Sequence, residues 1–419
     1  MSFPRFFRVR QDLPSHAVPS IDEALVAALS SSEDFAAIGE RDAVAIAVGS
    51  RGIDRIEELV ACLARSLKAR GAEPFIVPAM GSHGGATADG QERVLSSLGI
   101  TESLVKCPIR SSLETVKIGE SGAGHPILFD AVALQADHII PINRVKLHTR
   151  LLGKIQSGLC KMLMVGMGNH LGAQAYHPLF EQYGYQFERL VDDVVPQLIS
   201  SVPLACGIAV IEDAHKKIAE VECASPRAFL EVDRRLLTRS IGLSAKLPVR
   251  SAELLIIDEI GKEISGTGMD TNVVGRKWND KLPAENEWPK IREIYVRSLT
   301  ERSAGNANGI GIAEYTRRCV TEDMDPVKTR VNCVTAAHPT SGAVPIWFDN
   351  DREVLDAVCQ QSSIRPDQRR WLRIRNTLDL AEVECSEAIL PELQTREDLT
   401  ILSKPAELLF DAQQNLVTQ

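Results

Sequence analysis

The sequence has no long hydrophobic run, and only 5% of its 419 residues are aromatic. A membrane-spanning helix needs about 18 or more apolar residues in succession, and no segment supplies them. The first residues, MSFPRFFRVRQDLP, also lack the apolar stretch of a secretory signal. We therefore expect a cytoplasmic protein with no membrane partner.

Paired cysteines and an excess of positive charge are missing as well. The nine cysteines are dispersed without a CxxC pair, which is typical of reduced thiols rather than of a disulfide framework. The net charge of -9 argues against a nucleic-acid partner. No P-loop, HExxH or GxSxG motif is present. The composition is that of an ordinary globular protein, and the length favours more than one domain.

Apolar runs of strand length alternate with segments of helical periodicity. Each run is apolar throughout, which indicates strands buried on both faces of a parallel sheet. The alternation predicts α/β architecture with right-handed crossovers. The predicted strands are 43–48, 73–80, 136–143, 206–213, 253–261, 330–337 and 379–386, and the predicted helices include 53–71, 88–100 and 185–202.

The strand at 253–261 repeats the pattern of the first strand, so we place a domain boundary just before it. The prediction is two α/β domains, residues 1–250 and 251–419, with largely parallel sheets and an active-site cleft between them. Ligands of such sheets bind beyond the carboxyl ends of the strands. Four polar or glycine-rich loops follow strands there, and we expect them to converge: 49–52, 81–85, 143–149 and 261–272.

Two histidines stand in these loops. Glycines on both sides of the Ser82-His83 pair leave His83 accessible to a ligand, which suits a general acid or base, although a turn histidine that caps the next helix is an equal alternative. His148 lies in a basic segment, where neighbouring cations disfavour the imidazolium and suit a base. A solvated basic surface explains the same segment. Its cations are Arg144, Lys146, Arg150 and Lys154.

Lys161 is flanked by apolar residues on both sides, in QSGLCKMLMVGMG. Burial of an ammonium is unfavourable by several kcal/mol unless the amine is paired or chemically changed. Its pKa would fall, which suits a nucleophile or an attachment point. The alternative is a lysine that extends to solvent from the edge of a helix.

His170 and His177 follow the lysine, and imidazole is a common ligand of nickel, zinc and iron. Two histidines seven residues apart are no metal signature by themselves. The intervening GMGNHLG only approximates a dinucleotide-binding fingerprint and follows no clear strand.

In order and spacing, these residues resemble the lactate racemase family, whose enzymes use a nickel-pincer nucleotide. The first strand ends in a loop with an arginine, AIAVGSRG, and the second ends in a Gly-x-His loop with His83. His148 precedes the Ser-Gly-x-x-Lys segment of residues 157–161, and His177 lies sixteen residues beyond the lysine. The resemblance is clear over residues 40–180 and loose beyond them.

The resemblance implies roles for these residues. Lys161 would hold the cofactor through a thioamide, and His177 would complete the coordination of nickel. His83 and His148 would flank a 2-hydroxy acid as paired bases, so that the protein is an isomerase. Arg51 would bind the substrate carboxylate and line the cofactor. The other cofactor contacts implied are Gly49, Ser50, Ser157 and Gly158.

The second half departs from the family pattern, because it has no Gln-x-x-Lys segment for the substrate. The available replacements are Lys262, Asp270, Asn272 and Arg276, with Trp347 as a pocket wall. These changes, with the cations near His148, favour a larger or more anionic hydroxy acid than lactate, such as a sugar acid.

Two other functions remain open. One is a metal-dependent lyase or hydrolase that uses His170 and His177, and the other is a non-catalytic α/β protein that binds a small molecule. The first interpretation alone needs Lys161, and it implies pincer-cofactor biosynthesis proteins as partners. Whether the chain forms a homo-oligomer stays open.

Overall fold

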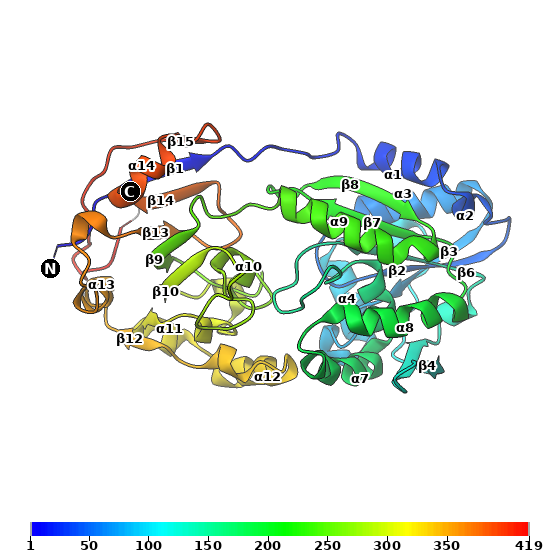
Figure 1. The fold of residues 1–419 in the computed structure, drawn as a ribbon. Coiled ribbons are helices and arrows are strands. Elements are labelled where there is room, and N and C mark those ends of the chain that lie inside the picture. The colour runs from blue at the N-terminus through cyan, green and yellow to red at the C-terminus, as the bar shows by residue number, and fades with distance from the viewer. Residues whose placement is uncertain (1, 418–419) are drawn as a thin grey trace. The chain divides into compact units, whose positions relative to one another are not determined.

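The computed structural model describes residues 2–417 and divides the chain into two units (Figure 1). The N-terminal unit runs from Pro14 to Ser244, and the C-terminal unit begins at Ala245. In the described residues, no helix is long and apolar enough to span a bilayer.

The boundary at 244/245 differs slightly from the predicted one at 250/251, and the residues up to Leu13 belong to the C-terminal unit. The reason is strand pairing. Strand β1 (Phe6–Gln11) forms antiparallel ladders with β14 (Glu382–Ser386) and β15 (Leu399–Ile401). The N-terminal unit is therefore inserted between the first strand of the other unit and the rest of it.

The N-terminal unit has a five-stranded sheet in the order β3-β2-β6-β7-β8, in which only the edge strand β8 is antiparallel. A two-stranded hairpin, β4-β5, lies apart from this sheet. The strands are β2 (Ala43–Val48), β3 (Glu73–Pro78), β4 (Thr115–Glu120), β5 (Pro126–Asp130), β6 (His138–Arg144), β7 (Gly207–Glu212) and β8 (Ile218–Ala224). The helices are α1 (Ile21–Ser30), α2 (Glu33–Ala36), α3 (Ile56–Ala69), α4 (Ala88–Ser97), α5 (Glu102–Val105), α6 (Leu159–Lys161), α7 (Asn169–Gln182), α8 (Phe187–Ser201) and α9 (Phe229–Leu243), with a π-helical turn at Met162–Gly166.

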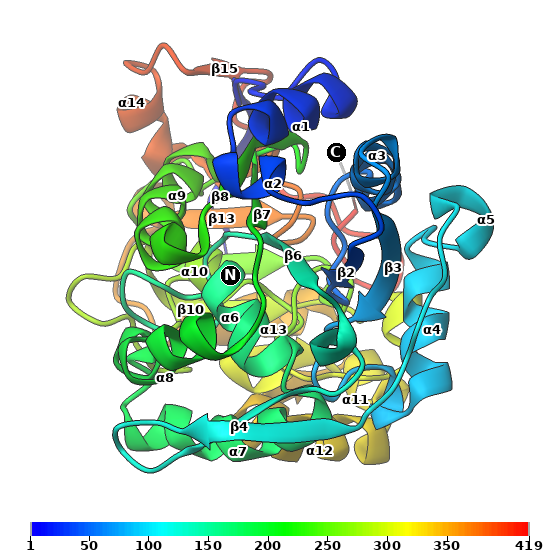
Figure 2. The same ribbon diagram turned by 90° about the vertical axis from the view of Figure 1, so that its right-hand side faces the viewer.

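Both faces of this sheet are covered by helices, which explains why its strands are apolar throughout. In β2, Ala45 and Ala47 pack into one core with α6 to α9, whereas Val44, Ile46 and Val48 pack into a second core with α1 to α4. Figure 2 shows α1 to α3 on one side of the strands and α6, α8 and α9 on the other. The predicted doubly covered parallel sheet is confirmed.

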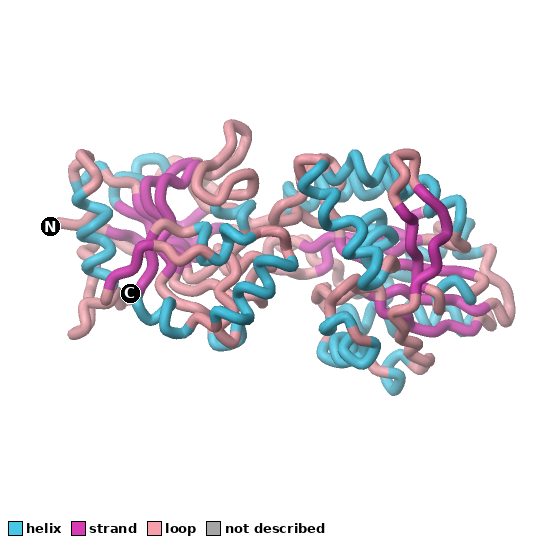
Figure 3. The backbone as a smooth tube through the Cα atoms, turned by 90° about the horizontal axis from the view of Figure 1, so that it is seen from below, coloured by secondary structure: helices cyan, strands magenta, loops and turns pink. Residues whose placement is uncertain are grey.

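The C-terminal unit has an eight-stranded mixed sheet in the order β12-β11-β10-β9-β13-β14-β1-β15. The first five strands of this order are mutually parallel, and the last three are antiparallel. Figure 3 shows these strands gathered among helices and long loops. The remaining strands are β9 (Ser251–Ile257), β10 (Lys290–Val296), β11 (Tyr315–Arg317), β12 (Ile346–Phe348) and β13 (Trp371–Ile374), and the helices are α10 (Thr271–Val274), α11 (Arg318–Asp323), α12 (Pro326–Thr335), α13 (Asp351–Gln360) and α14 (Leu390–Leu393).

The predicted strand at 330–337 is wrong, because most of this segment belongs to helix α12. Pro326 stands at the first helical position, and the Asp325 carboxylate accepts hydrogen bonds from Val327 and Lys328 N–H. The buried residues Thr329 and Cys333 are four apart, which is the period of a helix. The capping signal outweighs the β-branched composition of the segment.

The parallel strands β2, β3 and β6 end at one edge of the N-terminal sheet, as predicted for the loops 49–52, 81–85 and 143–149. The fourth predicted loop, 261–272, belongs to the C-terminal unit. The carboxyl edge of the N-terminal sheet is therefore the place where the candidate residues of this unit are gathered.

Candidate active site

The segment that carries Lys161 packs directly on the carboxyl edge of the sheet. The Gly81 N–H donates a hydrogen bond to the Gly166 carbonyl at 3.3 Å. A Cβ atom at Gly166 would lie 2.8 Å from the Ala79 carbonyl oxygen, so this contact requires glycine. A Cβ atom at Gly49 would lie 3.3 Å from the Met162 methyl carbon. The ends of β2 and β3 thus hold the turn that follows Lys161.

Lys161 has a strongly lowered pKa, about 7 instead of 10.5. Burial of the amine is the largest cause, and the positive charges of Arg51 and Lys146 add to it. A large fraction of the side chain is consequently neutral at pH 7. A neutral amine is the nucleophilic form, so Lys161 is suited to form a covalent bond with an electrophilic carbon.

His177 lies on α7, close enough to Lys161 for the two charges to interact. Burial lowers the pKa of His177, and the charge of Lys161 lowers it further. Its ring packs on Phe180 with a centroid distance of 5.3 Å. The neutral imidazole favoured in this way is the form that binds a metal ion.

A residue that the sequence analysis did not find holds the start of α6. The Asp233 carboxylate, fully buried on α9, accepts hydrogen bonds from Leu159 N–H at 3.0 Å and Cys160 N–H at 2.9 Å. Burial raises the pKa of Asp233 to about 7, although these hydrogen bonds lower it. The side chain thus acts as an N-terminal cap supplied by a distant helix.

Gly158 completes this arrangement. Its φ of 91° is in the left-handed region that favours glycine, and a Cβ atom would lie 2.1 Å from Asp233 Oδ1. Its carbonyl accepts a hydrogen bond from Asn143 Nδ2 at 2.6 Å. Gly158, predicted to contact the cofactor, therefore has a defined structural role, because it lets the backbone approach the carboxylate.

Ser157, the first residue of the Ser-Gly-x-x-Lys segment, ties that segment to the loop after β6. Its hydroxyl accepts a hydrogen bond from Lys146 N–H at 2.7 Å and donates one to the Lys146 carbonyl at 2.6 Å. One residue earlier, Gln156 Oε1 accepts from His148 N–H at 3.0 Å. The loop with His148 and the segment with Lys161 are consequently held as one piece.

His148 is itself fixed by backbone contacts. Its Nδ1 accepts hydrogen bonds from Arg150 N–H and Leu151 N–H, each at 3.1 Å. The ring therefore closes the turn that follows it, in the way that a side-chain oxygen caps a helix.

His83 lies in the exposed loop after β3, and its Nδ1 is hydrogen-bonded to the Ser50 hydroxyl in the loop after β2. Adjacent pairing of β2 and β3 brings the two loops together. Ser50, predicted as a cofactor contact, thus orients the imidazole of His83. Because a hydroxyl can donate or accept, this contact allows either tautomer of the ring.

The basic segment around His148 does not form one free patch. Arg144 makes an ion pair with buried Glu212, and the Arg150 guanidinium lies over the Tyr185 ring at 4.2 Å. Lys154 is exposed at a loop. Lys146 is the cation of this segment whose charge lowers the pKa of Lys161.

The residues present fit a pincer-type nickel cofactor. A pincer supplies three donors to the metal itself, so the protein must add an attachment point and a single ligand. Lys161 and His177 offer a nucleophilic amine and a neutral imidazole that interact with each other. Within residues 2–417, no group of three or more His, Cys, Asp or Glu side chains could hold a metal ion unaided.

In the C-terminal unit, two of the predicted substrate residues are part of the structure's own hydrogen bonding. Arg276 is fully buried and donates to the Ile291 and Arg292 carbonyls at 2.9 and 2.8 Å. Lys262 Nζ donates to the Gly266 carbonyl at 2.6 Å and to Asn332 Oδ1 at 2.8 Å. Arg276 in particular is a buried support of the sheet rather than a cation open to a ligand.

The other predicted residues of this unit differ from one another. Asp270 caps α10 and accepts hydrogen bonds from the backbone and side-chain nitrogens of Asn272 at 2.9 and 2.8 Å. Trp347 is 45% exposed, with the Arg318 guanidinium 5.0 Å from its ring centre. Lys277 was missed: burial lowers its pKa to about 8, although Asp270 and Glu287 raise it.

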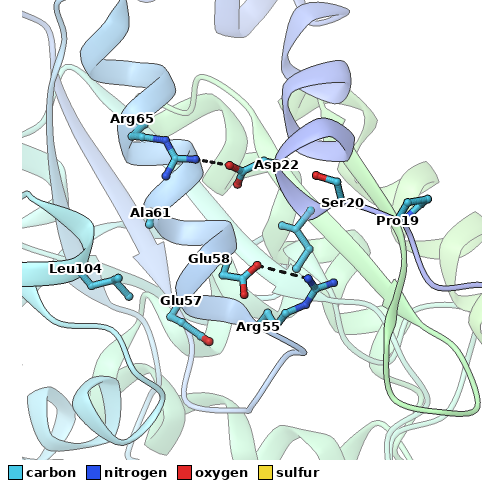
Figure 4. A pocket seen from close by; sticks show the side chains of 10 residues that line it. Pro19, Ser20, Asp22, Arg55, Glu57, Glu58, Ala61, Arg65 and Leu104 are labelled. Carbon is cyan, nitrogen blue, oxygen red and sulfur yellow. Dashed lines mark hydrogen bonds and ion pairs between the residues drawn. The ribbon is translucent and has the colours of Figure 1, made fainter.

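A surface pocket between α1 and α3 lies outside this group of residues (Figure 4). The Arg65–Asp22 ion pair at 2.5 Å and the Arg55–Glu58 ion pair at 3.5 Å cross it. None of the predicted site residues lines it.

The fold and the site define an α/β protein with a low-pKa lysine and a neighbouring histidine at the carboxyl edge of a parallel sheet. Residues 11–183 match the family described as lactate racemase N-terminal domain. This range includes His83, His148, Lys161 and His177. Through this domain, the chain is a member of the lactate racemase-like family.

A search of curated proteins finds no match to the chain. Among solved structures, it is similar to a protein from Thermotoga maritima, at 13% identity with a TM-score of 0.48 over 79% of this chain and 84% of that one. It is also similar to the lactate racemase apoprotein from Thermoanaerobacterium thermosaccharolyticum, at 12% identity with a TM-score of 0.45 over 70% of this chain and 74% of that one.

Proposed function

We propose that the protein is a nickel-pincer-nucleotide-dependent racemase or epimerase of a 2-hydroxy acid. One observation carries the proposal: Lys161, with a pKa of about 7, interacts with His177 inside a lactate racemase N-terminal domain. Neither a hydrolytic metal site nor a passive binding site needs an amine with this property.

In the proposal, Lys161 holds the cofactor through a thioamide and His177 binds the nickel ion. When bound, the group supplies an electrophilic ring that accepts and returns a hydride at the substrate carbon. The low pKa of Lys161 favours the amide-type bond, because the neutral amine attacks an activated carbonyl. Pincer-cofactor biosynthesis proteins are the implied partners.

The protein's own residues bind the substrate and move its proton. His83 takes the hydroxyl proton, and Ser50 orients the ring for this transfer. Arg51 binds the carboxylate of the substrate. Since the positive charges of Arg51 and Lys146 both reach Lys161, we propose a hydroxy acid more anionic than lactate, of the sugar-acid or dicarboxylate class.

The test is expression of the full chain together with the pincer-synthesis proteins, followed by intact mass and peptide mapping. We expect a nucleotide-sized adduct on Lys161 and about one nickel ion per chain. Lys161→Ala should lose both. The control is Lys154→Ala, which removes an exposed lysine of the same region and should keep both. Unmodified Lys161 without nickel under these conditions would falsify the proposal.

The alternative metal site at His170 and His177 gains no support. The two residues lie on one helix, and seven residues separate them by about 10 Å along its axis. Neither belongs to a metal-binding group among the described side chains.

A further inference from the structure

We infer that His148 is a fixed hydrogen-bond donor toward the substrate, and that His83 is the proton acceptor of the pair. The inference rests on the proposed function for the identity of the reaction. It departs from the expectation that the two histidines act as equivalent bases.

The argument begins with the two backbone N–H groups at His148 Nδ1. Arg150 and Leu151 both donate to this nitrogen at 3.1 Å. A backbone N–H can only donate, so the Nδ1 atom that receives it must offer its lone pair. A hydrogen on Nδ1 would point at two other hydrogens. The proton of the neutral ring must therefore be on Nε2.

A histidine in this form cannot accept a proton at Nε2, because that nitrogen already carries one. Taking up a second proton would require Nδ1 to lose both backbone partners and open the turn at Leu151. What the ring can do is donate from Nε2. A donor held in place suits an oxygen that gains negative charge, such as the hydroxyl of a 2-hydroxy acid as it loses its proton.

The contact at His83 has the opposite property. Its Nδ1 meets the Ser50 hydroxyl, which can accept as well as donate. With the proton on Nδ1 shared toward Ser50, Nε2 has a lone pair for the substrate proton. In the proposed step, the substrate O–H bond breaks and an N–H bond forms on His83, while His148 keeps its own proton.

The loop environment explains why His148 keeps this form. The His148 N–H is bonded to Gln156 Oε1, and the adjacent Ser157 bonds both backbone groups of Lys146. The turn of residues 148–151 is thus anchored at both ends, since Leu151 is buried in the core. A ring inside a fixed turn has little freedom to exchange its acceptor nitrogen.

The direct test is the tautomer of each ring in the full-length protein, labelled with ¹⁵N-histidine, at neutral pH. Long-range ¹H–¹⁵N correlation spectra distinguish a nitrogen that carries hydrogen from one that does not. We expect an unprotonated Nδ1 and a protonated Nε2 at His148, assigned by loss of its signals in His148→Asn. A protonated Nδ1 at His148, alone or with Nε2, would overturn the inference. This result does not depend on cofactor loading, so it can be read even where the proposed function fails.

The variants separate the two roles. His148→Asn offers a side-chain oxygen to the two N–H groups, so the turn should persist while the distal donor is lost. In cofactor-loaded protein, we expect an unchanged adduct on Lys161 and a fall in turnover of roughly 100-fold, the size typical of removing one fixed donor. Turnover equal to that of the unsubstituted enzyme would overturn the assigned role. Ser50→Ala is the matched control, because it should change the spectrum of His83 and leave that of His148 unchanged.

Discussion

The backbone N–H of Cys160 donates a hydrogen bond of 2.9 Å to the carboxylate of Asp233, one residue before the lysine that is proposed to hold the cofactor. The two residues are 73 positions apart in the chain. Through this contact, helix α9 determines where α6 begins and, with it, where Lys161 is placed.

Replacing Asp233 with Asn should therefore change the chemistry of Lys161 without touching it. One backbone N–H loses its acceptor, which costs on the order of 2 kcal/mol of unfolding free energy. A loosened α6 gives the Lys161 amine more water and raises its pKa toward 10.5. Each unit of increase should slow acylation by a small amine reagent at pH 7 about tenfold. Peptide mapping of the modified protein measures this rate.

Asp130→Asn is the control for loss of a buried carboxylate. Asp130 is also fully buried and accepts a hydrogen bond from Ala133 N–H at 2.7 Å, whereas the bonds to Leu159 and Cys160 N–H come from Asp233. We expect a comparable loss of stability with an unchanged rate at Lys161. Equal rates in the two variants would contradict the positioning role of Asp233.

Gly158→Ala should be among the most harmful small substitutions in the N-terminal unit. The added methyl would lie 2.1 Å from Asp233 Oδ1, so either the carboxylate or the backbone must move. We expect a loss of about 3 kcal/mol or more, with failure to form the adduct on Lys161. Gly124→Ala is the comparison, because it has a similar φ of 82° and no described atom within 4 Å of the added methyl. It should cost only about 1 kcal/mol. Denaturant titration of both variants provides the measurement.

Stability of the unmodified protein should depend on pH through Lys161. Its folded-state pKa is about 7, below the unfolded value of 10.5, so between these values the unfolded chain holds a proton that the folded chain lacks. Stability therefore rises with pH across this window. Lys161→Met removes the cost, and we expect it to stabilise the protein by about 1–3 kcal/mol at pH 6 after allowance for partial exposure. The difference should shrink toward pH 10. A constant difference over this range would contradict the lowered pKa.

Ser50→Ala should lower turnover and leave the cofactor in place. The substitution removes the partner of His83 Nδ1, while the amine of Lys161 and the ring of His177 stay as they are. Loss of about 1 kcal/mol of orientation corresponds to a roughly fivefold fall in kcat. Steady-state kinetics on protein with a confirmed adduct measures it. A lost adduct would instead assign Ser50 to cofactor binding.

The parallel sheet of the N-terminal unit could be predicted from sequence because its strands are apolar on both faces. That pattern, in 43–48 and 73–80 above all, is what burial between two layers of helices requires. The same rule placed His83 at the edge of the sheet. The segment 330–337 misled, because its valines lie on the exposed face of α12 and imitate a strand.

Other features could not be predicted because the residues that make them are far apart in sequence. Nothing near Asp233 marks it as a cap for Leu159 and Cys160. Arg276 appeared available to a substrate, yet its guanidinium is enclosed by carbonyls of β10, and that enclosure depends on the tertiary fold. The hydrogen bonds to His148 Nδ1 also depend on the path of the loop, so the sequence shows a histidine but not its tautomer.

The pairing of β1 with β14 and β15 has a consequence for the order of events during synthesis. Strand β1 leaves the ribosome first, whereas its partners begin at Glu382 and Leu399 and leave it near the end. The central insert, residues 14–244, can complete its own sheet in the meantime. The outer unit must wait for contacts that span almost the whole chain, and such contact order slows folding. A ribosome stalled before residue 382 should therefore present a protease-resistant insert followed by an unprotected chain.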